Sequence, residues 1–186
     1  NLTWEKTTTY NAGIDFNLFG TGIIDGSFDA YWRETTDLLA RVPLPPGQGL
    51  SSSFVDNVGS TESYGFETNL NLNLIQSEDL SLSLNTNWAY NFVEITDLGG
   101  ADLLPASGTL RGTGAFLRYQ GVDSQPFSAY VFKQVYDTDG DPVPNAFVDR
   151  NGDGQITFDD RYLVPTIPNW TYGFGLNLNY KNWDLS

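Results

Sequence analysis

The sequence predicts an all-β protein in which antiparallel strands form a segment of a transmembrane β-barrel with long extracellular loops. Three observations predict this class. Apolar and uncharged polar residues alternate along several stretches, aromatic residues lie near the ends of the apolar series, and short connections alternate with long ones. Each observation fits strands that cross a membrane, because successive side chains of a strand point to opposite sides of the backbone.

The alternation is clearest in the stretches 64–74, 80–90 and 172–180. In each stretch one series of alternate positions is aliphatic or aromatic, except for Thr68 and Thr86, and the other series is mostly Asn, Ser and Gly. Alternation alone also fits a soluble β-sandwich with one face in water. A water-facing sheet usually carries Lys, Glu, Arg and Thr, so the small neutral side chains favour a wet lumen.

We therefore expect one series to face lipid and the other to face the lumen. The positions expected to face lipid are Leu70, Leu72, Leu74, Leu80, Leu82, Leu84, Leu176 and Leu178. Those expected to face the lumen are Asn69, Asn71, Asn85, Asn87, Asn177 and Asn179. Aromatic residues at both ends of a series, as in 172–180, are typical of a strand that meets two membrane interfaces.

The connections support the same prediction. Strands are expected near 9–18, 24–32, 62–75, 80–91 and 170–180. The links between them are alternately short and long, as in outer-membrane barrels with short periplasmic turns and long external loops. The long links, 35–61 and 92–169, are therefore expected to be extracellular. Within the second, 112–120 and 128–136 could be two further spanning strands or an external hairpin, because both have mixed faces.

Composition excludes several classes of function. Lys plus Arg is 9 and Asp plus Glu is 23, so the formal charge of −14 argues against nucleic acid as a partner. Cys and His are both absent, which removes thiolate chemistry and the commonest general base, and no enzyme activity is expected. No apolar run is long enough for a helical membrane span. The chain has no Met and stops near the start of a further predicted strand, so we expect an internal piece of a longer protein.

One acidic motif predicts a calcium site. In the loop 149–160 the oxygen-bearing residues follow the spacing of an EF-hand loop, and Gly154 stands at the position of its sharp bend. The predicted ligands are Asp149, Asn151, Asp153, the carbonyl of Gln155, and Asp160. We expect calcium to act structurally here. The alternative is an Asp/Asn/Gly turn that only hydrogen-bonds its own backbone.

Four motifs, in order along the chain, resemble those of SusC-like TonB-dependent outer-membrane receptors. Residues 4–16 resemble the family's W-E-K-T-x-x-x-N-x-G-x-D-F, and residues 31–39 resemble Y-x-R-x-T-x-D-L-L. Residues 57–67 are similar to N-x-G-x-x-x-N-x-G-x-E, with Ser63 in place of the second Asn. Residues 149–154, followed by Asp160 and Arg161, resemble D-x-N-G-D-G…D-R. The resemblance covers nearly the whole chain.

The resemblance implies a 22-stranded barrel of the outer membrane of Bacteroidetes, preceded by an N-terminal plug. Residues 1–186 would be part of its C-terminal half, with the plug absent. Such receptors import glycans or peptides with energy that TonB transmits through the plug, and a SusD-like surface lipoprotein closes the external mouth. The alternative function is a soluble, calcium-stabilised β-sandwich that binds carbohydrate or acts as an adhesin.

Overall fold

The computed structural model describes residues 2–19, 22–44, 47, 53–106 and 118–186. Strands dominate these residues, and the single helical element among them is the one-turn η1 (Phe158–Asp160). The prediction of an all-β, antiparallel fold is therefore confirmed. No helix in the described part of the chain is long and apolar enough to cross a membrane.

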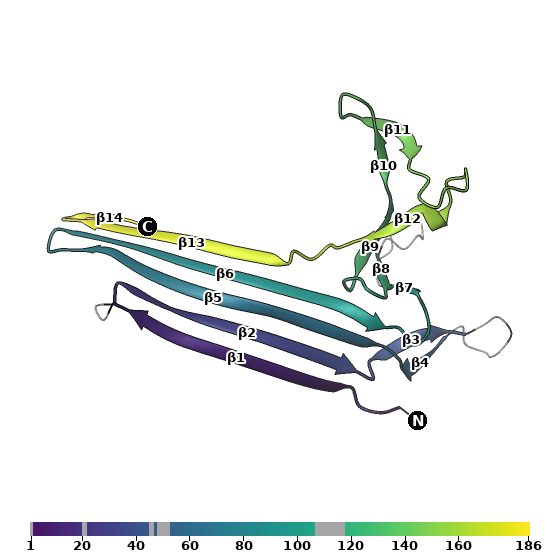
Figure 1. Ribbon diagram of the computed structural model, residues 1–186, viewed down its shortest axis with the longest axis horizontal. Helices are drawn as coiled ribbons and strands as arrows, with labels where there is room; N and C mark the ends of the chain where they lie inside the picture. Colours follow the sequence, from purple (N-terminus) through teal and green to yellow (C-terminus); the bar gives the residue numbers. More distant parts are fainter. Residues whose placement is uncertain (1, 20–21, 45–46, 48–52, 107–117) are drawn as a thin grey trace.

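Six long and short strands form one antiparallel sheet in the order β1-β2-β5-β6-β13-β14. Figure 1 shows them side by side, with the loop structures gathered beyond one end of the sheet. The strands are β1 (Lys6–Leu18), β2 (Ile24–Thr36), β5 (Ser60–Gln76), β6 (Leu80–Asp97), β13 (Trp170–Tyr180) and β14 (Trp183–Leu185). The stretches expected to be strands coincide with β1, β2, β5, β6 and β13, and the first four run longer than the alternation indicated.

Short turns join these strands at one end of the sheet only. The β5–β6 turn is closed by Ser77, whose N–H donates to the Leu80 carbonyl at 2.9 Å. The β13–β14 turn contains Lys181 with a φ of 53°, a left-handed conformation that a tight reversal requires. At the opposite end β2 connects to β5, and β6 to β13, through long segments. The alternation of connection lengths is thus built into the sheet.

A β-bulge changes one detail of the predicted faces. Leu72 pairs with Leu84, but Ile75, rather than Leu74, pairs with Leu82, because the register shifts between Asn73 and Ile75. A bulge inserts one unpaired residue, so the side chains after it change sides relative to the partner strand. The adjacent apolar residues Leu74 and Ile75 conceal this shift in the sequence.

The long connections are folded structures. The first holds the hairpin of β3 (Leu39–Pro43) and β4 (Ser53–Asn57). The second forms a four-stranded sheet in the order β12-β9-β8-β7 and a separate hairpin, β10-β11. Residues 98–106 and 118–169 are called the loop body below. Its strands are β7 (Leu103–Pro105), β8 (Arg118–Gly121), β9 (Ser128–Phe132), β10 (Gln134–Tyr136), β11 (Pro142–Phe147) and β12 (Arg161–Val164).

The segments 112–120 and 128–136 were expected to be either two spanning strands or an external hairpin. Residues 112–117 lie outside the described part of the chain, but β8 and β9 pair with each other and belong to the four-stranded sheet. In the large sheet β6 pairs directly with β13. The described parts of these two segments are therefore not spanning strands of that sheet.

The hydrophobic core lies where the end of β6 meets the loop body, and not on the apolar face of the large sheet. Among the described residues, the buried apolar side chains are Ile95, Leu98, Leu104 and Ala106. On the large sheet, Phe28 and Trp88, which lie on inner strands, remain 42% and 48% exposed. A β-sandwich buries the inner faces of two packed sheets. The sandwich alternative is therefore not favoured, because this sheet is a single layer.

Candidate functional site: a two-faced wall and its loop-side rim

The apolar face of the large sheet is organised in cross-strand rows. In the row nearest the long connections Tyr10 pairs with Trp32, Trp32 with Tyr64, and Tyr64 with Phe92. Nearer the short turns the pairs are aliphatic, as in Leu72, Leu84 and Leu176. The face therefore has an aromatic zone on the loop side and an aliphatic zone on the turn side.

The apolar face ends at a row of carboxylates. Glu34 lies opposite Glu62, and Glu62 opposite Glu94, one pair of residues beyond the aromatic row. Trp32 donates its indole N–H to Glu62. Like charges directly opposite each other destabilise a sheet, and water weakens their repulsion. This row marks the level at which the apolar face gives way to an aqueous environment.

Side-chain hydrogen bonds cross-link the polar face, most densely on its first strands, and between β6 and β13 Asn179 donates to the Ser81 hydroxyl at 3.2 Å. Asn71 donates to the Asp25 carboxylate at 2.8 Å, and Asn69 to the Ser27 hydroxyl at 3.3 Å. Where residues 80–90 of β6 pair with 170–180 of β13, this face consists of Asn, Ser, Ala, Thr and Gly, without charge. A hollow of about 390 Å³ lies there above Gly173 and Gly175. Such a wall can hydrogen-bond water or a polar solute.

Gly65 allows an aromatic side chain to lie across the polar face. Tyr31 packs over this glycine, where an added Cβ would stand 2.9 Å from the tyrosine ring and 2.2 Å from the Tyr90 carbonyl oxygen. The Tyr31 hydroxyl donates to Asn91. The same tyrosine supports Arg33, which lies over its ring and donates to Thr9 at 3.4 Å. Sequence patterns did not indicate this contact, because it depends on cross-strand register.

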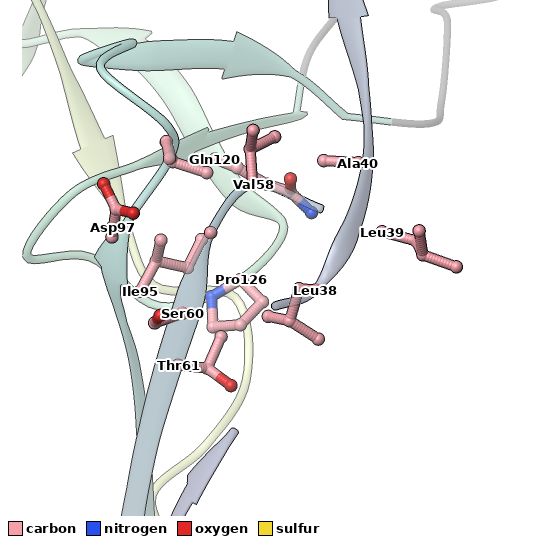
Figure 2. Close-up of a pocket in the computed structure, with 12 residues that line it drawn as sticks. Leu38, Leu39, Ala40, Val58, Ser60, Thr61, Ile95, Asp97, Gln120 and Pro126 are labelled. Atoms are coloured by element: carbon pink, nitrogen blue, oxygen red, sulfur yellow. The ribbon is translucent and has the colours of Figure 1, made fainter. Parts of the chain in front are cut away.

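The large sheet is called the wall below, and the residues at its loop-side end that meet the loop body are called the rim. The rim surrounds a cavity of about 200 Å³. Figure 2 shows its lining, which comes from the start of β3, the β4–β5 junction, the end of β6, strand β8 and the loop residues Leu98 and Pro126. Ile95, in β6, forms a bridge to Ser124 and packs with Leu98 and Leu104. The residues of the lining are Leu38, Leu39, Ala40, Val58, Gly59, Ser60, Thr61, Ile95, Asp97, Leu98, Gln120 and Pro126.

The predicted calcium loop is closed by hydrogen bonds to its own backbone. The Asp149 carboxylate accepts from Gly152 at 2.7 Å and from Gly154 at 2.8 Å. Asn151 Oδ1 accepts from the Asp153 N–H at 3.0 Å, and Asp153 Oδ1 accepts from Gln155 at 2.8 Å. Gly152 and Gly154 have φ values of 76° and 82°, which favour glycine.

Asp160 is the fully buried member of this loop. Its carboxylate accepts from the backbone N–H groups of Arg150 and Thr157, each at 2.7 Å, and so ties the two ends of the loop together. The Thr157 bond is the largest cause that lowers the pKa of Asp160, with further lowering from Arg150, Asn151 and Asp149, while burial opposes it. The charged carboxylate is thus the stable form.

The structure brings Asp149, Asn151, Asp153, Gln155 and Asp160 into one loop, but in the arrangement of a self-bonded turn. Within the described residues no three acidic side chains are grouped so as to hold a metal ion. Next to the loop, the Arg161 guanidinium carbon lies 4.2 Å from the centroid of the Phe158 ring and 4.6 Å from that of Phe132. These stacked groups fix the loop to β9, a contact that the sequence did not indicate.

Comparison with known proteins gives consistent results along the whole chain. Residues 1–186 match the family model for the β-barrel of TonB-dependent receptor-like proteins. The TonB-dependent receptor SusC of Bacteroides thetaiotaomicron is 40% identical over 192 residues, which cover 100% of this chain and 19% of that protein. The TonB-dependent receptor P3 of Formosa agariphila is 33% identical over 207 residues, covering 100% of this chain and 20% of that protein.

Solved structures show the same architecture. The RagAB peptide transporter aligns with a TM-score of 0.68 and 25% identity, over 96% of this chain and 20% of that one. The open-open state of the RagAB peptide importer aligns with a TM-score of 0.70 and 24% identity, over 97% and 20% of the two chains. The chain thus spans about a fifth of the length of these proteins. It belongs to the TonB-dependent receptor β-barrel family, of the SusC-like type, and is a segment of an outer-membrane barrel.

Proposed function

We propose that the protein containing these residues is a TonB-dependent active transporter that imports glycans or peptides across the outer membrane. Residues 1–186 form part of its barrel wall and external mouth. The observation that carries the proposal is the two-faced sheet, with one apolar and one mostly neutral polar side, in a chain that matches the family over its full length. In a barrel wall the apolar face contacts lipid and the polar face contacts water, so each face has a favourable environment.

The apolar face meets lipid and the polar face lines the lumen. Along β6, the apolar series extends from Leu80 to Phe92. At about 3.3 Å per residue, and with a tilt of about 40°, this series is roughly 30 Å tall, close to the thickness of a membrane core. The carboxylate row of Glu34, Glu62 and Glu94 then lies outside the core. The short turns are periplasmic, and the long connections 35–61 and 92–169 are extracellular.

The rim and the loop body form part of the mouth that a SusD-like lipoprotein covers. Their position supports this, because both lie beyond the loop-side end of the wall (Figure 1). The cavity lined by Ile95, Val58 and Pro126 lies where the wall meets the loop body. Coupling to TonB would pass through a plug elsewhere in the protein. Cargo of the peptide class is supported by RagAB, which is described as a peptide transporter.

Uptake in intact cells tests the proposed function. The gene of the whole protein is deleted in frame, and uptake of labelled oligosaccharides and peptides is compared with that of wild-type cells and of cells without a working TonB motor. We expect the uptake of one cargo class to be lost in both mutants and restored by complementation. If the deletion strain takes up every cargo at the wild-type rate, or if uptake does not need TonB, the proposal is wrong.

We further propose that the loop 149–160 binds calcium as a structural ion through Asp149, Asn151, Asp153, the Gln155 carbonyl and Asp160. The ligand spacing supports this. The hydrogen bonds that these carboxylates accept from the loop's own backbone support the alternative, a polar turn without a metal. Protection from proteolysis distinguishes the calcium site from the turn. Calcium should slow proteolysis between Asp137 and Asn169 in the wild type, but not in the variant with Asp149→Ala and Asp153→Ala. Equal protection of both proteins, or of neither, would leave only a turn.

A further inference from the structure

The apolar face carries a preformed hollow of about 330 Å³ between β6 and β13. Its walls are the rings of Trp88, Trp170, Tyr172 and Phe174. Trp88, which lies on the inner strand β6, remains 48% exposed although these rings lie next to one another. The hollow is therefore an apolar groove that opens on the side of the sheet that faces lipid.

Thr86 leaves space beside the hollow. It is a small residue that lies between the larger Leu70 and Phe174 on the neighbouring strands. Its hydroxyl donates to the Gly173 carbonyl at 3.1 Å and accepts the indole N–H of Trp88 at 2.7 Å. The second bond draws the Trp88 ring along its own strand toward Thr86. The Thr86 hydroxyl and the Trp88 indole N–H are thereby both satisfied, so neither requires water.

The walls are held by ring contacts on both sides. Trp170 lies 4.9 Å from Tyr90 and 5.7 Å from Phe66 between ring centroids, and Phe28 continues this series on β2. On the other side Phe174 packs edge-on against Trp88 at 6.4 Å. Such aromatic pairs stabilise each other beyond their buried area. The hollow therefore does not depend on an occupant to keep its shape.

Polar groups stand at the loop-side edge of the hollow. The indole N–H of Trp170 has no acceptor among the described residues, and this side chain is 55% exposed. Tryptophan at a membrane interface typically places its ring in the apolar layer and directs its N–H to polar lipid groups. An apolar groove whose loop-side walls, Trp170 and Tyr172, each carry a donor matches a lipid, whose acyl chain begins at an ester oxygen.

We propose that this hollow holds one acyl chain of an outer-membrane lipid, and that Trp170 donates its N–H to an ester oxygen of that lipid. The hollow is continuous with the lipid-facing surface, so a lipid chain reaches it without crossing the barrel wall. The proposal rests on the outer-membrane location and not on import, so a wrong assignment of cargo leaves it unchanged. Its consequence is one ordered lipid per barrel at the junction of β6 and β13.

Native mass spectrometry of the whole protein tests this proposal. The protein is purified from outer membranes and exchanged extensively into a second detergent, and the retained lipids are counted. We expect Phe174→Ala to lower the occupancy of one lipid by roughly tenfold, or about 1.4 kcal/mol of binding free energy. Tyr10→Ala is the matched control, because Tyr10 lies on the same face, is 67% exposed and does not line the hollow.

A photoreactive phenylalanine analogue provides a second measurement that keeps an aromatic ring in place. After detergent exchange, the analogue at Phe174 should cross-link to a lipid chain, whereas the analogue at Tyr10 should not. If both positions lose their cross-links after exchange, or if Phe174→Ala and Tyr10→Ala retain equal numbers of lipids, the hollow contacts only bulk lipid and the proposal is overturned.

Discussion

In the large sheet, side chains on inner strands, such as Phe28 and Trp88, are 42% and 48% exposed, whereas in the loop body Leu98 and Leu104 are only 6% and 7% exposed. Both regions are antiparallel β-structure with similar residue types. The sheet presents its apolar side chains outward in a single layer, while the loop body turns them inward. The difference indicates two solvents: lipid stabilises the first region from outside, and water drives the second to form a core.

The two regions meet at a defined residue of β6. Up to Phe92 the even-numbered side chains are apolar, whereas after it the odd-numbered Val93 and Ile95 are apolar. Ile95 thereby points into the core of the loop body and is only 3% exposed. The strand continues without interruption while its apolar side chains change from one face to the other. The sequence of β6 therefore shows where the lipid-facing region ends and the loop body begins.

The largest difference between the regions is expected for a truncated leucine. Leu104→Ala should open a cavity in the small core and destabilise the loop body by about 2–5 kcal/mol. The same change at Leu72, on the apolar face, should cost only about 0.5 kcal/mol, because lipid chains fill the vacated space. Hydrogen exchange of the whole protein in lipid measures both effects. Similar costs at the two positions would show that the two regions have the same surroundings.

A charge on the wall should separate its two faces. Leu72→Arg places a guanidinium in the apolar layer and should cost about 2–4 kcal/mol, as measured by denaturant unfolding of the whole barrel in vesicles. Asn71→Arg, at the adjacent position, should cost much less, because the polar face offers water and the nearby Asp25 carboxylate. A larger cost at Asn71 than at Leu72 would reverse the assignment of the faces.

A smaller effect is expected from side chains added to glycines of the polar face. Gly65→Val should displace Tyr31 and cost about 1–3 kcal/mol, because the added atoms would collide with the Tyr31 ring and the Tyr90 carbonyl. Gly175→Ala is the control, since its Cβ would stand 4.0 Å from the nearest atoms of Asn85. Denaturant unfolding should distinguish the two variants, and equal stability would refute the packing of Tyr31 over Gly65.

The smallest expected effect is local and depends on pH. The pKa of Asp160 is lowered in the folded loop, so the stability that this carboxylate contributes is complete above the unfolded value of about 3.9 and is lost as pH falls through the lower folded pKa. Cleavage of the loop by an acid-active protease should therefore rise only at pH values below about 4. In Asp160→Asn, cleavage should be rapid at every pH, and a wild-type profile would contradict this role.

The spanning strands could be predicted because their two solvents impose a period of two on the sequence. The strand predicted at 80–91 stopped short of the observed end of β6 because its apolar side chains change faces after Phe92. The bulge at Leu74 was concealed by the apolar Ile75 beside it. The strands of the loop body are short, and their pairing depends on contacts distant in sequence, such as Ile95 with Ser124. No local pattern specifies such contacts.

For the candidate sites, too, local features could be predicted from the sequence and contacts between distant residues could not. The calcium loop was found from its spacing, but the sequence could not show that Asp160 would be buried and bonded to the backbone of Arg150 and Thr157. The aromatic residues 172 and 174 were predicted to lie on the lipid side. The hollow beside them was not, because it requires the register that places Thr86 opposite Phe174.

The apolar face of the large sheet is expected to contact lipid and the polar face to contact water, and spin labels test this difference directly. Residues 1–186 contain no cysteine. A single cysteine at each of positions 69–72, in the whole protein with any cysteine elsewhere replaced, can therefore carry a spin label. Collision rates with oxygen, which concentrates in lipid, and with a water-soluble nickel complex are measured at each position in vesicles. We predict strict alternation, with oxygen favoured at Leu70 and Leu72 and nickel at Asn69 and Asn71. Equal accessibility to both probes at all four positions would contradict a barrel wall.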